Sequence, residues 1–157
     1  MTQPETLPQR KRPAHPMPVQ HHNEPIVVLV TVCTNKRNPV LASPLLHEAL
    51  RVQWERANAW SVGTYVIMPD HVHLFAVPGA YPPIAVTRWV AYWKRLASIV
   101  RPELEPLWQR DCWDMQMRDV EGYREKLAYV RMNPVRKGLV THPEDWPYAG
   151  EIQAIRW

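Results

Sequence analysis

The feature that most restricts the fold of this chain is a pair of alternating segments joined by two turn residues. Residues 60–68 alternate along a predicted strand, and Pro69-Asp70 supplies turn chemistry directly after them. Residues 71–76 then alternate again, as a second strand does. The two segments are therefore predicted to pair as a β-hairpin.

The segments around this hairpin complete a sheet with helices. The elements predicted in chain order are a strand at 26–34, a helix at 44–58, the two hairpin strands, a helix at 84–100, a strand at 107–117 and a third helix at 119–133. Ser43 and Asp119 are the predicted N-caps of the first and third helices. This order predicts an α+β fold, the ferredoxin-like or RRM-like split βαβ arrangement, with an additional C-terminal helix. Its four-stranded antiparallel sheet carries two helices on one face and leaves the other face for function.

The ends of the chain differ in composition from this domain. Residues 1–25 are rich in proline and carry the basic run at 10–12, so we expect a disordered basic arm. Residues 26–148 form the predicted domain, and 149–157 form a C-terminal tail.

Composition indicates the class of partner and the compartment. The net charge of +4 and the pI near 9.3 favour a polyanionic partner. Cys33 and Cys112 stand in no CxxC pattern, so buried thiols are expected rather than a disulfide or a zinc site. Since no apolar run reaches transmembrane length and the start of the chain has no hydrophobic signal core, we expect no membrane partner and a cytoplasmic, nucleoid-associated protein.

Four residues are candidates for chemistry on the predicted elements. His71 and His73 are two apart on a strand, so both imidazoles leave the same face, as a pair of metal ligands would. The spacing alone slightly favours the alternative, two polar residues on a solvated face of the sheet. Tyr129 and Asn133 are four apart on the third helix and share one face. By pattern alone, Tyr129 also fits a core residue of the helix, and Asn133 fits a cap for the turn that Pro134 begins.

Two motifs together resemble one family. Met-Pro-Asp-His-Val-His-Leu-Phe at 68–75 and Tyr-Val-Arg-Met-Asn-Pro-Val-Arg-Lys-Gly-Leu-Val at 129–140 resemble the single-tyrosine HUH transposases, above all their REP-associated tyrosine transposases. Stretches at 31–39, 108–110 and 145–148 fit as well, so the resemblance covers the domain at 26–148. It weakens at Ala149-Gly150, where the family commonly has serines.

The resemblance implies a mechanism and the residues that carry it. His71 and His73 match the metal-binding pair, and Asn133 matches a third ligand for Mg²⁺ or Mn²⁺, which would act as a Lewis acid on the scissile phosphate. Tyr129 matches the nucleophile that forms a 5′-phosphotyrosine and releases a 3′-hydroxyl. Because a phenol is mostly protonated at neutral pH, it needs help from the metal or, less directly, from Lys126 or Arg136.

The resemblance also implies the substrate, single-stranded DNA folded as a small hairpin. The residues predicted to contact its phosphates are Lys94, Arg110 and Arg136. Trp89, Trp93 and Trp113 are candidates for base stacking, with core packing as the alternative for at least two of them.

Three functions can be compared with these observations. The first is a metal-dependent DNA strand transferase acting through Tyr129. The alternative is a catalytically silent, domesticated protein that binds DNA hairpins. An RNA-binding module would need paired aromatic residues on its central strands, where this chain has histidines. Whether the protein is a monomer or a homodimer stays open.

Overall fold

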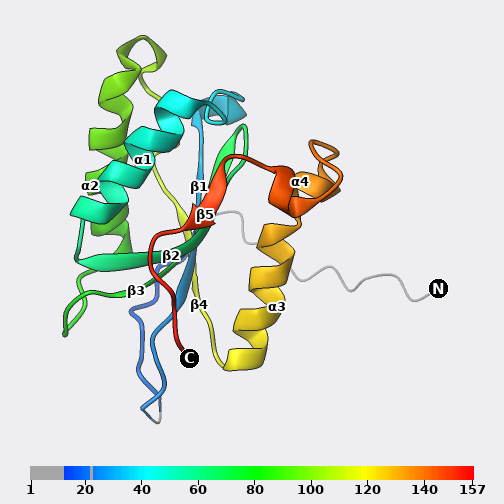
Figure 1. The fold of residues 1–157 in the computed structure, drawn as a ribbon. Coiled ribbons are helices and arrows are strands. Elements are labelled where there is room, and N and C mark those ends of the chain that lie inside the picture. The colour runs from blue at the N-terminus through cyan, green and yellow to red at the C-terminus, as the bar shows by residue number, and fades with distance from the viewer. Residues whose placement is uncertain (1–12, 22) are drawn as a thin grey trace.

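The hairpin predicted around Pro69-Asp70 lies inside a five-stranded sheet in the computed structural model, which describes residues 13–21 and 23–157 (Figure 1). The elements are β1 (Val28–Cys33), α1 (Pro44–Arg56), β2 (Trp60–Ile67), β3 (His71–Pro78), α2 (Val86–Ala97), β4 (Trp113–Gln116), α3 (Val120–Arg131), α4 (Asn133–Arg136) and β5 (Ala149–Glu151). The strand order is β4-β1-β3-β2-β5, and every neighbouring pair is antiparallel. The first four strands have the order of the predicted split βαβ sheet, so the predicted fold class is confirmed.

Helix ends agree with the predicted caps. The Ser43 side chain accepts a hydrogen bond from the Leu46 N–H at the start of α1, and Asp119 accepts one from the Gly122 N–H at the start of α3. Helix α3 ends at Arg131, two residues before the prediction, because Pro134 prevents regular helix across this point.

The fifth strand and the length of β4 differ from the prediction. Strand β5 pairs with β2 although residues 149–157 were expected to form a C-terminal tail outside the sheet, and its short Ala-Gly-Glu sequence gives no strand signal. A Cβ at Gly150 would meet the Tyr65 hydroxyl at 2.8 Å, so glycine permits this close pairing. Strand β4 covers only Trp113–Gln116, and the predicted strand residues before it form a loop that touches β1 through one bridge, Thr34 to Trp108.

Helices α1 and α2 cover one face of the sheet and enclose the main core (Figure 1). Trp93 lies at its centre, with edge contacts to Trp54, Trp89 and Trp108 at centroid distances of 5.7, 6.0 and 5.9 Å. Trp89 and Trp93 are fully buried, so both belong to the core and neither can stack on a base.

Two conservative changes in this core are expected to differ in cost. The Trp89 indole donates a hydrogen bond to the Ala57 carbonyl at 2.7 Å, whereas the buried Trp93 Nε1 has no partner among the described residues. Trp89→Phe should therefore destabilise the protein by about 1 kcal/mol more than Trp93→Phe, because only the first change strands a buried carbonyl. Urea unfolding of the two variants measures the difference, and equal costs would contradict it.

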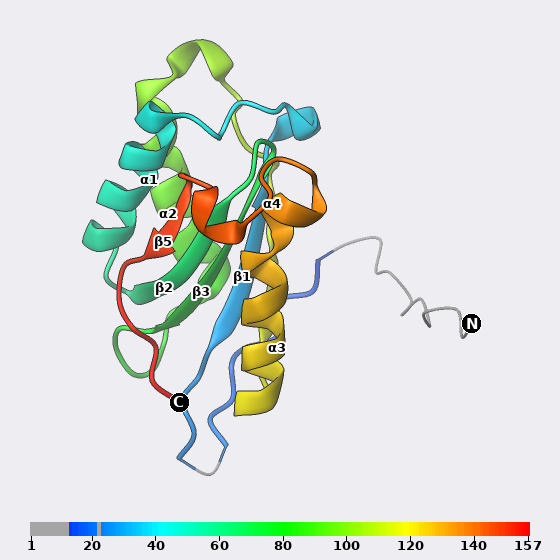
Figure 2. The same ribbon diagram turned by 45° about the vertical axis from the view of Figure 1, so that its right-hand side comes forward.

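Helix α3 packs on the opposite face of the sheet, as the view in Figure 2 shows. Its Tyr123 and Val130 join a smaller cluster with Phe75, Val66 and Met117, and the Phe75 and Tyr123 rings meet edge to face at 5.3 Å. This cluster holds α3 against the face from which the two histidines project. The functional face is therefore partly covered, not open along its whole length.

Residues 13–21 lie beside β4. The Val19 backbone and the Gln116 side chain exchange two hydrogen bonds, of 2.9 and 2.7 Å, and the His15 ring contacts the carboxylates of Asp111 and Asp114. This part of the predicted arm has no helix or strand but contacts the domain. The basic run at 10–12 and His22 lie outside the described residues.

Two further features concern the cysteines and the length of the helices. Cys33 and Cys112 are both buried and unbonded, as predicted. In the portion of the chain that the structure describes, no helix is both long enough and apolar enough to cross a membrane.

Candidate active site

The two histidines of β3 form the centre of the site. Their rings meet edge to face with centroids 4.7 Å apart. The Nδ1 atom of His71 lies 2.7 Å from the Asp70 carboxylate, and Nδ1 of His73 lies 2.8 Å from the Thr31 hydroxyl. Because a carboxylate only accepts, His71 carries its proton on Nδ1. The Nε2 atom of His71 is therefore an acceptor that is available to another partner.

Both imidazoles are held in the neutral form. Burial, followed by the nearby charges of His71, Arg136 and Arg37, lowers the pKa of His73 from 6.5 to about 3. Burial also lowers the pKa of His71, although the Asp70 carboxylate opposes this shift. A neutral imidazole is the form that binds a metal ion, so neither ring has to lose a proton first.

Asp70 is fixed in turn by Arg37. The Arg37 Nε donates to the second carboxylate oxygen of Asp70 at 2.9 Å, and Nη1 donates to the Cys33 sulfur at 3.0 Å. Burial by itself would raise the pKa of Asp70, but hydrogen bonds from His71 and Arg37 lower this pKa and keep the carboxylate ionised. The sequence favoured a turn residue at this position, and the structure shows that the carboxylate also orients a histidine.

Asn133 brings the helical segment to the histidines. It begins α4, directly after the break at Met132, and only 5% of its side chain is exposed. Its amide Nδ2 lies 3.1 Å from Nε2 of His71. The predicted pair of Tyr129 and Asn133 thus spans the break between α3 and α4, and Asn133 alone contacts a histidine.

Tyr129 stands at the surface beside these groups. It is 58% exposed, which excludes the core alternative. The Arg136 guanidinium lies 3.6 Å from the centre of its ring, and Nη1 donates to the Tyr129 carbonyl at 2.5 Å. Lys126 is farther away, with Nζ at 6.0 Å from the ring centre. The positive charge of Arg136 also contributes to lowering the pKa of His73, after burial and the charge of His71.

Lys94 and Arg110 lie elsewhere. Both line a groove of about 640 Å³ beside α2, which covers the face opposite the histidines. Lys94 is 8% exposed, and its Nζ donates to the carbonyls of Gln109 and Arg110 at 2.7 and 3.4 Å. Its ammonium therefore binds carbonyls inside the protein, which does not fit the predicted phosphate contact. Arg110, in contrast, is exposed.

The donor set at the histidines fits a divalent ion. The two imidazole rings are in contact and the buried Asn133 amide lies against His71; the amide can turn its oxygen toward an ion in place of the Nδ2 that now faces His71. Such a mixed nitrogen and oxygen set suits Mn²⁺ and Mg²⁺. A second group of metal-ligating type, His15, Cys112 and Asp114, lies beside β4 with its ligand atoms within 4.8 Å of one another.

Thr31 and Arg37 are contributors that the sequence did not single out for these roles. Thr31 lies directly opposite His73 across the β1–β3 pairing. Both residues lie in a stretch that fits the family, but only the register and the loop after β1 reveal their partners. Arg37 has a φ of 54°, a left-handed conformation that its bonds to Asp70 and Cys33 hold in place.

Removing the Asp70 carboxylate is expected to weaken metal binding. Asp70→Ala should lower the affinity for Mn²⁺ by about 10- to 100-fold, because His71 then loses the acceptor that fixes its tautomer and ring orientation. Isothermal titration measures the affinity, and Asp145→Ala, at an exposed turn, is the matched control. An unchanged affinity in Asp70→Ala would contradict this role.

Comparison with known proteins adds independent information. No protein-family model matches the chain. A protein of Escherichia coli K12 named REP-associated tyrosine transposase is 26% identical over 119 residues, covering 73% of this chain and 69% of that protein. A Haemophilus influenzae protein, provisionally described under the same name, is 32% identical over 95 residues, covering 53% of this chain and 54% of that protein.

A solved structure gives the same result for the fold. The structure of a REP-associated tyrosine transposase bound to a REP hairpin matches with a TM-score of 0.69 and 22% identity, covering 83% of this chain and 79% of that one. At this identity the likeness shows a shared fold. The sequence and fold comparisons together confirm that this chain resembles the REP-associated tyrosine transposases, as its two motifs indicated.

Proposed function

We propose that this protein is a metal-dependent strand transferase that cleaves single-stranded DNA beside a hairpin and holds one end as a 5′-phosphotyrosine. The observation that carries the proposal is a pair of neutral histidines with the buried Asn133 amide against His71, and an exposed tyrosine, Tyr129, four residues before Asn133. The relatives named transposases support the same class of reaction.

Tyr129 is the proposed nucleophile. Its oxygen attacks the phosphorus, and the bond from phosphorus to O3′ breaks. The phenol gives its proton to solvent, and the leaving O3′ takes up a proton from solvent. Arg136 holds the tyrosine ring from one side and places a positive charge beside the phosphate that Tyr129 would meet. The new ester keeps the phosphate activated for rejoining, since its attack by a 3′-hydroxyl simply reverses the reaction.

His71, His73 and Asn133 are the proposed metal ligands. Asp70 and Thr31 orient the two imidazoles by holding their Nδ1 atoms. When bound, Mg²⁺ or Mn²⁺ would supply a Lewis acid for the phosphate oxygens and stabilise the leaving oxygen.

A DNA hairpin with adjoining single strand is the proposed substrate. Arg136 lies against Tyr129 and Arg37 pairs with Asp70 beside His71, and with Lys137 these cations outnumber the one carboxylate at the site. Positive charge beside a proposed cleavage site favours a phosphate backbone. The related structure is bound to a REP hairpin, which supports this class of DNA.

A labelling experiment tests the reaction and its polarity. The protein is mixed with hairpin oligonucleotides from its genomic neighbourhood and Mn²⁺, and a denaturing gel separates covalent products. A label at the 3′ end of the DNA should stay with the protein, and a label at the 5′ end should leave on a shorter fragment. Binding without any covalent product across several hairpins would favour the alternative, a catalytically silent hairpin-binding protein.

A further inference from the structure

A cross-strand row links the histidine site to the edge of the sheet. Trp113 of β4 lies opposite Thr31 of β1, Thr31 lies opposite His73 of β3, and His73 lies opposite Val66 of β2. Residues directly opposite in antiparallel strands project from the same face. The Trp113 side chain therefore leaves the sheet on the histidine face, two strands and roughly 10 Å from His73.

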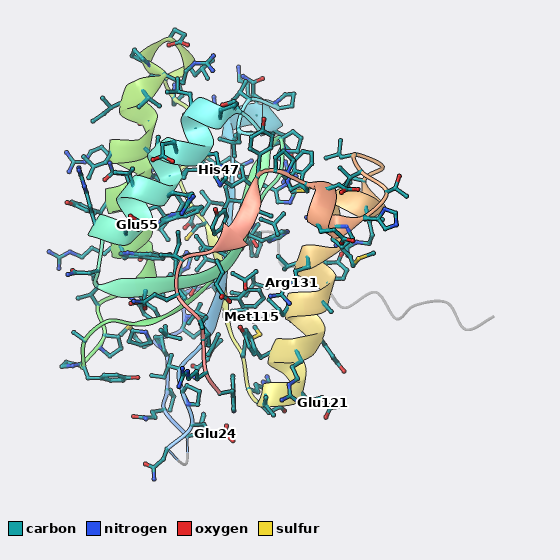
Figure 3. All side chains as sticks on the ribbon, viewed as in Figure 1. Glu24, His47, Glu55, Met115, Glu121 and Arg131 are labelled. Atoms are coloured by element: carbon teal, nitrogen blue, oxygen red, sulfur yellow. The ribbon has the colours of Figure 1, made fainter. Side chains whose placement is uncertain are left out.

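Trp113 is exposed on that face, and so is its neighbour in the alternation. Trp113 is 40% exposed and Met115 is 45% exposed, whereas Met117, the next residue of the same alternation, is buried beneath α3. Figure 3 shows Met115 on the side of the sheet that faces α3. The small cluster under α3 includes Leu29 and Val66 but neither Trp113 nor Met115, so these two apolar side chains stay exposed beside it.

The surroundings indicate what these two side chains would bind. On the site side, Arg136 lies against Tyr129 and Arg37 pairs with Asp70 beside His71, and with Lys137 these cations outnumber the one carboxylate. The result is a cationic centre, which would hold a phosphate backbone. An exposed indole next to such a centre is the arrangement that binds single-stranded nucleic acid, because every base has a flat face that can stack. A base on Trp113 and its phosphates at the cationic centre would lie on one face of one sheet.

We propose that Trp113, supported by Met115, stacks on an unpaired base of the DNA strand that enters the site and so positions the phosphate to be cleaved. This inference rests on the proposed function and deepens it, because it assigns a base-positioning residue to the single-stranded part of the substrate. The inference gives the unpaired strand a protein contact that the hairpin stem does not share.

The test measures binding alone, so that it does not depend on cleavage. Trp113→Ala is introduced into the Tyr129→Phe protein, and fluorescence anisotropy in EDTA compares one hairpin with and without a single-stranded extension. Affinity for the extended hairpin should fall by about 5- to 150-fold, and affinity for the bare hairpin should stay the same. Trp113→Phe should keep most of the affinity, and Trp113→Leu should lose most of it.

Controls on the protein and on the DNA keep the test independent of folding. Tyr92→Ala removes a similarly exposed ring from α2, on the opposite side of the sheet, and should change neither affinity. Abasic sites are placed one at a time in the single-stranded extension. At one of these positions, Trp113→Ala should cause no further loss of affinity, because the base that Trp113 would stack on is already missing.

Equal losses for both DNAs, or no abasic position that removes the effect, would overturn the stacking role. The proposed function fails in a different experiment, when the unmodified protein gives no covalent product. The two failures are therefore distinguishable.

Discussion

Tyr129→Phe is expected to abolish the covalent protein–DNA product. The change removes one oxygen and keeps the ring that Arg136 covers at 3.6 Å, so the local structure should be retained. Since phenylalanine has no nucleophilic atom, the product should fall by at least about a thousandfold, the scale on which loss of a nucleophile acts in covalent catalysis. A denaturing gel with labelled hairpin DNA measures it.

Binding and matched variants separate chemistry from folding in this test. Tyr129→Phe should bind hairpin DNA with nearly unchanged affinity, because the lost hydroxyl lies on an exposed ring. Tyr81→Phe and Tyr92→Phe remove hydroxyls from two other exposed tyrosines and should leave the covalent product at its full level. A product that survives in Tyr129→Phe would assign the nucleophile to another residue.

His71→Ala and His73→Ala are each expected to remove the stabilisation that Mn²⁺ gives to the folded protein. At a Mn²⁺ concentration of 100 times its Kd, binding adds about 2.7 kcal/mol to the stability. For a chain of this size that raises Tm by roughly 5–10 °C. Each variant should lose most of this rise and, with it, the covalent product, because one imidazole nitrogen is missing from the ligand set.

The choice of metal and of controls makes this result specific. His142→Ala removes an exposed histidine and should keep the full rise in Tm. The second cluster, at His15, Cys112 and Asp114, contains a thiol and so favours softer ions, which is why Mn²⁺ is used rather than Zn²⁺. A rise that persists in both site variants but disappears in Asp114→Ala would place the ion at the second cluster.

The low histidine pKa values add a pH dependence to the same experiment. A histidine with an ordinary pKa of 6.5 is about nine-tenths protonated at pH 5.5, and protons would weaken its metal binding roughly tenfold. Burial and nearby charges lower the pKa of His73 to about 3, and burial lowers that of His71. Between pH 7.5 and 5.5, protons at His73 should therefore leave the affinity for Mn²⁺ almost unchanged, and protons at His71 should weaken it by less than tenfold, which isothermal titration can measure.

Local sequence determined the elements and the faces on which the candidate residues lie. Alternation around Pro69-Asp70 predicts the central hairpin and puts both histidines on one face, and the strand pairing confirms it. The side chains of Ser43 and Asp119 cap their helices as predicted, because a cap is a contact over three residues and depends on little else. Pro134 likewise ends α3 through its own covalent geometry.

Tertiary structure decided which side chains meet, because these contacts join residues that are distant in sequence. The Thr31 hydroxyl contacts His73, which is 42 residues away in the sequence, and the Asn133 amide contacts His71, which is 62 residues away. Lys94 looked like a phosphate contact in the sequence, but packing of α2 buried it on the opposite face. Trp113 and Trp93 differ in their surroundings, since the first stays exposed beside the cluster under α3 and the main core encloses the second. Side-chain type and spacing fix the local geometry, whereas exposure and partnership depend on what the rest of the chain places beside each residue.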